Sequence, residues 1–174
     1  MNIVITGSRG LAKELHNQLC QEHTVICVDR STGHDIINVE AWAKEFYHYD
    51  VCINSAYSKW SQVDVLEQFY CMWKDFPKRQ IVNIGSSVSD YSRVETPKEH
   101  EYMEYRLHKQ ALQSAFSKLV KQTQCDIKLI NPGAINTDMI KHLNIDNKMS
   151  VTVAAKQIIK IMQDTMIKRV DLWL

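Results

Sequence analysis

The chain has 174 residues, of which 45% are hydrophobic and 24% charged, as in an ordinary globular domain. A net charge of +1, with no block of Lys or Arg, argues against nucleic-acid binding, and no apolar run approaches the ~18 residues of a membrane span. Five dispersed cysteines, behind an N-terminus without signal-peptide features, predict reduced thiols in a cytoplasmic protein. Metal is not expected, because no His, Cys and Asp cluster has ligand spacing.

Short β-rich runs alternate with helical patterns along the chain. Strands are predicted at 2–6, 24–28, 50–54, 81–85, 127–131 and 170–174, the first five almost continuously apolar, as when both faces are covered. Helices are predicted at 10–21, 38–48, 59–75, 101–122 and 150–163. This alternation predicts an α/β fold with a doubly wound parallel sheet, a Rossmann fold, in a single three-layer α/β/α domain spanning residues 1–174.

The first predicted strand leads into a glycine turn and a helix, in NIVITGSRGLAKEL. Gly7 allows the tight turn, Gly10 lets the backbone approach a ligand, and the helix N-terminus offers free N–H groups to a pyrophosphate. The alternative is a simple strand-to-helix turn without a ligand. Asp29, after the second strand, can accept hydrogen bonds from an adenosine ribose and favours NAD, whereas Arg9 and Arg30 could bind the 2′-phosphate of NADP.

The pentapeptide YRLHK places Tyr105 and Lys109 one turn apart on one face of the predicted helix 101–122. Tyr70 and Lys74 have the same spacing, so the spacing alone does not identify a site.

Taken in order, the motifs resemble those of the short-chain dehydrogenase/reductase family over nearly the whole chain. TGSRGLA is similar to the family's T-G-x-x-x-G-x-G turn, although it is one residue shorter and has Ala12 at the last glycine. INSA (53–56) resembles N-N-A-G, IVNIGSSV (81–88) the serine strand, YRLHK the Y-x-x-x-K motif, and NPGAINTDM (131–139) the P-G motif. The resemblance implies a catalytic Ser86, with Ser87 as the alternative, together with Tyr105 and Lys109.

The same resemblance implies a set of residues around a nicotinamide dinucleotide, NAD or else NADP. They are Thr6, Gly7, Ser8, Arg9, Gly10, Leu11, Asp29, Arg30, Asp35, Ile36, Asn54, Ser55, Ala56, Tyr105, Lys109, Pro132, Gly133, Ile135 and Thr137.

Departures from the family pattern accompany the resemblance. The stretch between Asp29 and Asp35 is too short for the family's usual helix, a shortcut similar to that of the related sugar-nucleotide reductases. No asparagine lies between Asn54 and Asn83, so the fourth member of the family's catalytic tetrad is missing or replaced. Residues 139–148 are also few for the usual substrate lid, which predicts an open site with weak, permissive binding.

The function expected from this resemblance is hydride transfer between NAD(P) and a small carbonyl or alcohol substrate. Tyr105 would be the general acid/base, with its pKa lowered by the Lys109 ammonium and by the positive nicotinamide ring of the oxidised cofactor. Ser86 would donate a hydrogen bond to the substrate oxygen. The first alternative is a dinucleotide-binding sensor or scaffold without turnover. The second, a sugar-nucleotide reductase or epimerase, is ranked last because such enzymes generally need a C-terminal substrate domain. A homodimer or homotetramer is expected, paired through 59–75 and 101–122.

Overall fold

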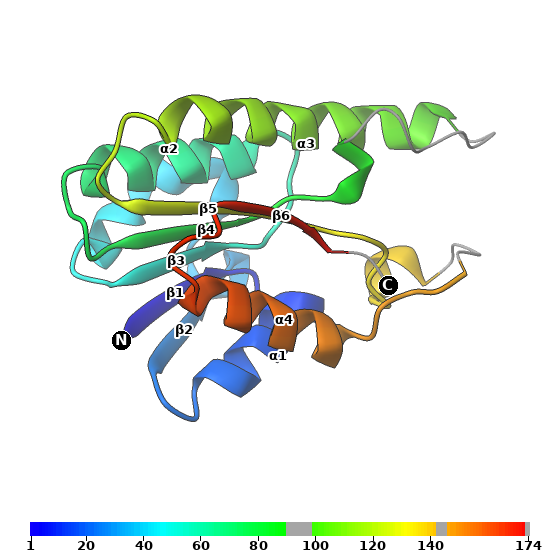
Figure 1. The fold of residues 1–174 in the computed structure, drawn as a ribbon, viewed down its shortest axis with the longest axis horizontal. Coiled ribbons are helices and arrows are strands. Elements are labelled where there is room, and N and C mark those ends of the chain that lie inside the picture. The colour runs from blue at the N-terminus through cyan, green and yellow to red at the C-terminus, as the bar shows by residue number, and fades with distance from the viewer. Residues whose placement is uncertain (90–98, 142–145, 173–174) are drawn as a thin grey trace.

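The computed structural model describes residues 1–89, 99–141 and 146–172, and a six-stranded sheet runs through them (Figure 1). All adjacent strands are parallel, in the order β2-β1-β3-β4-β5-β6. The strands are β1 (Asn2–Thr6), β2 (Thr24–Val28), β3 (Val51–Asn54), β4 (Gln80–Ile84), β5 (Asp126–Pro132) and β6 (Arg169–Leu172). The strand order reverses direction at β1, and this confirms the predicted doubly wound α/β fold.

Helices cover both faces of this sheet (Figure 1). The α-helices are α1 (Gly10–Leu19), α2 (Ser61–Trp73), α3 (Glu99–Leu119) and α4 (Val151–Gln163). The first and last pack on one face, while α2 and α3 pack on the other. Successive side chains of β1 point to opposite faces of the sheet and so contribute to both cores. Ile3 and Ile5 join the core beneath α1 and α4, and Val4 joins the core on the other face.

The predicted helix 38–48 is not an α-helix in the structure. Two 3₁₀ helices, η2 (Ile36–Ala41) and η3 (Ala43–Phe46), occupy this stretch, and Asn38 has the non-helical angles φ −122° and ψ 52°. Trp42 is buried, and its indole Nε1 donates to the carbonyl of Asp35 over 2.8 Å. Anchoring one large side chain against the sheet therefore takes precedence over the helical pattern.

The expectation that β2 is covered on both faces is also wrong. Its residues alternate between exposed and half-buried up to Val28, and Ile26 is 37% exposed. The cause is its place at the edge of the sheet, which the apolar run alone cannot reveal.

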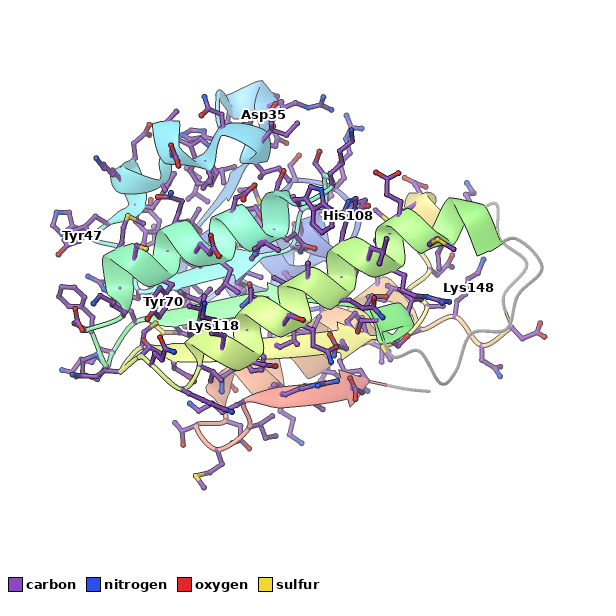
Figure 2. All side chains as sticks on the ribbon, turned by 90° about the horizontal axis from the view of Figure 1, so that it is seen from above. Asp35, Tyr47, Tyr70, His108, Lys118 and Lys148 are labelled. Atoms are coloured by element: carbon purple, nitrogen blue, oxygen red, sulfur yellow. The ribbon has the colours of Figure 1, made fainter. Side chains whose placement is uncertain are left out.

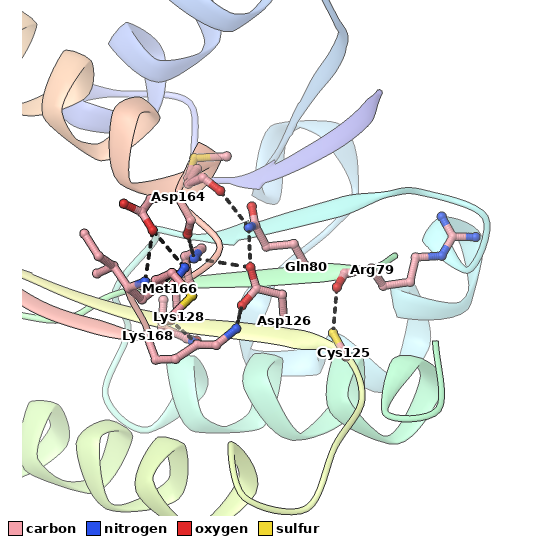
Figure 3. A network of polar contacts seen from close by, with 11 residues as sticks. Arg79, Gln80, Cys125, Asp126, Lys128, Asp164, Met166 and Lys168 are labelled. Atoms are coloured by element: carbon pink, nitrogen blue, oxygen red, sulfur yellow. Dashed lines mark hydrogen bonds and ion pairs between the residues drawn. The ribbon is translucent and has the colours of Figure 1, made fainter. Parts of the chain in front are cut away.

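A polar network fastens the amino ends of β4 and β5 to the end of α4 (Figure 3). The side chain of Lys128 is fully buried, pairs with Asp126 over 3.2 Å and donates to the carbonyls of Asp164 and Ile167. A cation beside helix-terminal carbonyls is favourable, because these groups carry the negative end of the helix dipole. This network lies at the opposite end of the strands from the predicted site residues.

Candidate active site

The predicted site residues follow the carboxyl ends of successive parallel strands, so the fold gathers them along one edge of the sheet. Open α/β sheets bind their ligands at this edge, beside the position where strand order reverses.

The glycine turn after β1 has the backbone that an anion site needs. Gly7 and Gly10 have φ values of +92° and +51°, a region that L side chains rarely adopt. A Cβ at Gly7 would lie 3.3 Å from the Cβ of Ala56, so the turn and the loop after β3 are already close. Helix α1 starts without a side-chain cap at Arg9 and without an acid in its first turn. Its first N–H groups can therefore face a phosphate, and the turn fits the pyrophosphate of a dinucleotide.

Two predicted cofactor residues are fully buried and support the site from beneath. The hydroxyl of Thr6 accepts hydrogen bonds from the backbone N–H groups of Ser55 and Ala56, over 2.9 and 3.0 Å. Asn54 donates to the carbonyl of Gln62 over 2.7 Å. Thr6 and Asn54 thus fix the loop that carries Ser55 and Ala56.

The carboxylate of Asp29, the residue after β2, is fixed in position by hydrogen bonds from nearby residues. It accepts hydrogen bonds from the backbone N–H and the hydroxyl of Ser31, over 2.7 and 2.6 Å, and from the hydroxyl of Ser8. The bonds from the Ser31 and Ser8 hydroxyls, in that order, lower the pKa of Asp29 to about 2. An ionised carboxylate has acceptor sites beyond those used here, so Asp29 can still bind a ribose diol.

Asp35 and Ile36 of the predicted dinucleotide residues, and the P-G loop after β5, differ in how they are placed. Ile36 is buried in the core, while Asp35 accepts from the backbone N–H of Ile37 over 3.1 Å. Gly133 donates to the carbonyl of Leu172 over 2.9 Å, and Thr137 lies against Gly10, where a Cβ would be 3.4 Å from its methyl group. The P-G loop therefore reaches the glycine turn. The predicted short lid, 139–148, falls partly outside the described residues.

Tyr105 lies with two of its expected partners. The side chain of Ser86 is close enough to the Tyr105 hydroxyl to lower the pKa of the phenol, and the Lys109 ammonium lies 5.4 Å from the centre of the Tyr105 ring. The serine in contact is thus Ser86, whereas Ser87 begins the short helix η4 (Ser87–Ser89).

Lys109 is buried among neutral acceptors. Its Nζ donates to the side-chain oxygen of Gln62 over 2.6 Å and to the carbonyl of Ile84 over 2.9 Å, and the residue is only 4% exposed. Burial lowers the pKa of Lys109 to about 7. Burial also raises the pKa of Tyr105 to about 12, a rise opposed by the Ser86 hydrogen bond and reinforced by Tyr57. The expected lowering of the Tyr105 pKa is therefore not met in the protein alone, because burial of the phenol is the largest influence on it.

Gln62 is a site residue that sequence reasoning missed. It stands at the start of α2, and its amide nitrogen donates to the carbonyls of Asn54 and Ile84, each over 3.1 Å. Its oxygen is left for Lys109. The sequence indicated that the asparagine of the family's tetrad is missing or replaced, but no spacing rule pointed to position 62.

Tyr57 and His108 were missed as well, although both lie beside Tyr105. The rings of Tyr57 and Tyr105 are 4.8 Å apart, and the Tyr57 hydroxyl is 2.8 Å from Nδ1 of His108. By contrast, the second Tyr–Lys pair lies elsewhere. Tyr70 is near the far end of α2 from His108 (Figure 2), and its hydroxyl donates to the carbonyl of Gln122 over 3.2 Å.

Within residues 1–89, 99–141 and 146–172, every helix is too short or too polar for a membrane span. Within those same ranges, no group of three or more His, Cys, Asp or Glu side chains could hold a metal ion.

The fold matches solved short-chain dehydrogenases across nearly the whole chain. A short-chain dehydrogenase from Burkholderia cenocepacia J2315, in complex with NADP, has a TM-score of 0.79 at 19% identity, covering 99% of this chain and 88% of that one. A short-chain dehydrogenase/reductase from Vibrio parahaemolyticus has a TM-score of 0.74 at 17% identity, with 98% of each chain covered.

A 3-alpha-hydroxysteroid dehydrogenase from Pseudomonas sp. B-0831, complexed with NADH, has a TM-score of 0.62 at 16% identity, covering 98% of this chain and 95% of that one. In sequence, the chain matches no protein-family model and no curated protein. These likenesses therefore show a shared fold.

Proposed function

We propose that this protein is an oxidoreductase of the short-chain dehydrogenase/reductase type, which transfers a hydride between a nicotinamide dinucleotide and a small carbonyl or alcohol substrate. The observation that carries the proposal is the position of the Lys109 ammonium, 5.4 Å from the centre of the Tyr105 ring, with Ser86 close enough to the same phenol to lower its pKa. A glycine turn with an uncapped helix N-terminus lies at the same edge of the sheet.

The dinucleotide would be held by the glycine turn, by Asp29 and by the loop after β5, and it would supply the hydride when bound. The glycine turn would bring the first backbone N–H groups of α1 to the phosphates, and the Asp29 carboxylate would meet the ribose of the adenosine. Both an NADP complex and an NADH complex occur among the structural neighbours. We favour NAD, because the ionised Asp29 would repel a 2′-phosphate.

Two hydroxyl groups, those of Tyr105 and Ser86, would act on the substrate. Tyr105 keeps its proton at neutral pH, so it is ready to donate that proton to the substrate oxygen during carbonyl reduction. Ser86 has one hydroxyl proton, and with substrate bound it would turn that proton from Tyr105 to the substrate oxygen, where negative charge develops. Lys109 provides positive charge behind the phenol, and Gln62 and the Ile84 carbonyl fix the position of its ammonium.

One observation favours the second candidate, a dinucleotide-binding sensor without turnover. A phenol with a pKa near 12 is a poor base at neutral pH, and Lys109 already has two protein acceptors. In this reading the Ser86, Tyr105 and Lys109 cluster stabilises the fold of a protein that reports on the dinucleotide.

A two-part experiment separates the candidates. NADH and NADPH binding is titrated by fluorescence, and oxidation of each is then followed against a panel of aldehydes, ketones and quinones. The oxidoreductase proposal predicts dinucleotide binding together with substrate-dependent oxidation. Binding without oxidation across the panel would favour the sensor, and absence of binding would contradict both.

A further inference from the structure

A second phenol shares the environment of Tyr105. Tyr57 directly follows the predicted cofactor residue Ala56, in the loop after β3, and is half-buried. Its ring meets the ring of Tyr105 edge to face, with an interplanar angle of 73°. The Lys109 ammonium lies 5.7 Å from the centre of the Tyr57 ring and 5.4 Å from that of Tyr105, so both phenols flank one cation.

The Tyr57 hydroxyl is held by a buried imidazole. His108 is 4% exposed, its Nδ1 is 2.8 Å from the Tyr57 oxygen, and the ring of Trp60 packs edge-on against it at 4.2 Å. On its other side, Nε2 lies 3.9 Å from the exposed carboxylate of Glu104.

The Tyr57 oxygen keeps the capacity to accept a hydrogen bond. Burial and the charge of Glu104 both raise the pKa of Tyr57, so its phenol stays protonated at neutral pH. A phenol oxygen has two lone pairs, so whether Tyr57 donates to Nδ1 of His108 or accepts from it, a lone pair remains for another partner.

We propose that Tyr57 is a substrate-binding residue that accepts a hydrogen bond from a hydroxyl group next to the reacting carbon, and that His108 is its positioning residue. This inference rests on the proposed function and narrows its substrate class to α-hydroxy carbonyl compounds and the vicinal diols formed from them. The hydrogen-bonding capacity of each side chain assigns it to one substrate group. Ser86 and Tyr105 supply donors for the carbonyl oxygen, whereas Tyr57 supplies the acceptor for the neighbouring hydroxyl.

Hydroxyacetone and 2-butanone form a matched pair for the test, because a hydroxyl in one replaces a methyl in the other. The parent should reduce hydroxyacetone with a kcat/KM about 10-fold higher, as one neutral hydrogen bond allows. Tyr57→Phe should remove most of this preference, mainly through a higher KM for hydroxyacetone, so that reduction of hydroxyacetone falls more than reduction of 2-butanone. Tyr70→Phe, which removes a phenol oxygen outside the site, should keep the preference.

His108 variants test the positioning role. His108→Asn can place an amide acceptor near Nδ1 and should keep part of the preference, whereas His108→Leu should lose it as Tyr57→Phe does. Thermal melting shows whether each His108 variant folds. If a His108 variant does not fold, the role of Tyr57 is tested by Tyr57→Phe alone, because that variant keeps the aromatic ring.

The outcomes separate this inference from the proposed function. An unchanged preference in Tyr57→Phe, alongside turnover that Tyr105→Phe abolishes, would overturn the role of Tyr57 and leave the oxidoreductase intact. An equal loss on both substrates would also overturn it, because recognition of the hydroxyl would then not be the role. A parent that reduces neither member of the pair, nor any compound of the panel, would overturn both proposals.

Discussion

Lys109 combines a buried position with a titratable charge, and its two hydrogen-bond acceptors are both amide oxygens. Neutral amide oxygens stabilise an ammonium less than a carboxylate would. Burial therefore has the larger effect and lowers the pKa of this lysine to about 7. The site thus has a charge that can change close to neutral pH.

The shifted pKa of Lys109 predicts a pH dependence of stability. Between its folded pKa of about 7 and its ordinary value of 10.5, the unfolded chain binds a proton that the folded chain does not, so stability rises with pH. The free energy of unfolding should increase from pH 7 to pH 9 by about 1–2 kcal/mol more in the parent than in Lys109→Met. Urea unfolding followed by circular dichroism at the two pH values measures the difference. Parallel behaviour of the two proteins would contradict a strongly lowered pKa.

Asp29 governs the choice of dinucleotide in this account. Its carboxylate is ionised over the working range of pH, because its pKa is lowered to about 2. NADH should bind more tightly than NADPH. Asp29→Ala should lower the ratio of the NADPH dissociation constant to the NADH dissociation constant by about 10-fold, because the variant loses a charged hydrogen-bond partner. Fluorescence titration with both dinucleotides provides the test. Tighter binding of NADPH by the parent would point instead to Arg9 and Arg30.

At the scale of elements, Lys128 links β5 to the end of α4. Lys128→Met leaves buried carbonyls and Asp126 with one partner fewer, so it should lower the free energy of unfolding by about 2–4 kcal/mol. Lys168 also pairs with Asp126 but is 46% exposed, and Lys168→Met should cost less than about 1 kcal/mol. Chemical denaturation of the two variants compares these costs. Equal costs would contradict the structural importance of the buried lysine.

The sequence predicted the main strands and helices because each has a sustained apolar pattern, and it failed where a tertiary contact overrides such a pattern. Anchoring of Trp42 replaced the predicted helix 38–48 with 3₁₀ turns. Gly85 gave no signal at all, yet a Cβ there would lie 1.9 Å from the side-chain oxygen of the buried Asn131. Packing between neighbouring strands creates this requirement, and no local spacing encodes it.

The same limit explains the site. The family resemblance placed Ser86 and Tyr105 in one predicted site, and in the structure Ser86 is close enough to lower the pKa of Tyr105. Gln62, Tyr57 and His108 come together only because α2, α3 and the loop after β3 converge at one edge. Their partners are distant in sequence, so only the folded chain identifies them.

For the whole molecule, we expect a homodimer formed through α2 and α3. Both helices cover one face of the sheet, and Met103 and Leu107 of α3 remain 46% and 49% exposed. Burying such side chains between two copies is favourable, and isologous pairing is the commonest arrangement of soluble oligomers. Leu107→Lys should therefore shift the population toward monomer, while Met166→Lys, at an 86% exposed position outside these helices, should not.

Light scattering coupled to size-exclusion chromatography measures the assembly at micromolar concentration. A parent protein that is monomeric under these conditions would contradict the dimer.

The central claim is that Tyr105 exchanges a proton with the substrate, and Tyr105→Phe tests it most directly. This change removes one oxygen and leaves the ring, α3 and the glycine turn in place, with Tyr70→Phe as the matched control. We predict that kcat on a substrate of the parent falls by about 10²–10⁴-fold, as is typical of general acid–base groups, while the dissociation constant of the dinucleotide hardly changes. Parental turnover in Tyr105→Phe, on a substrate that Tyr70→Phe also converts normally, would contradict the account.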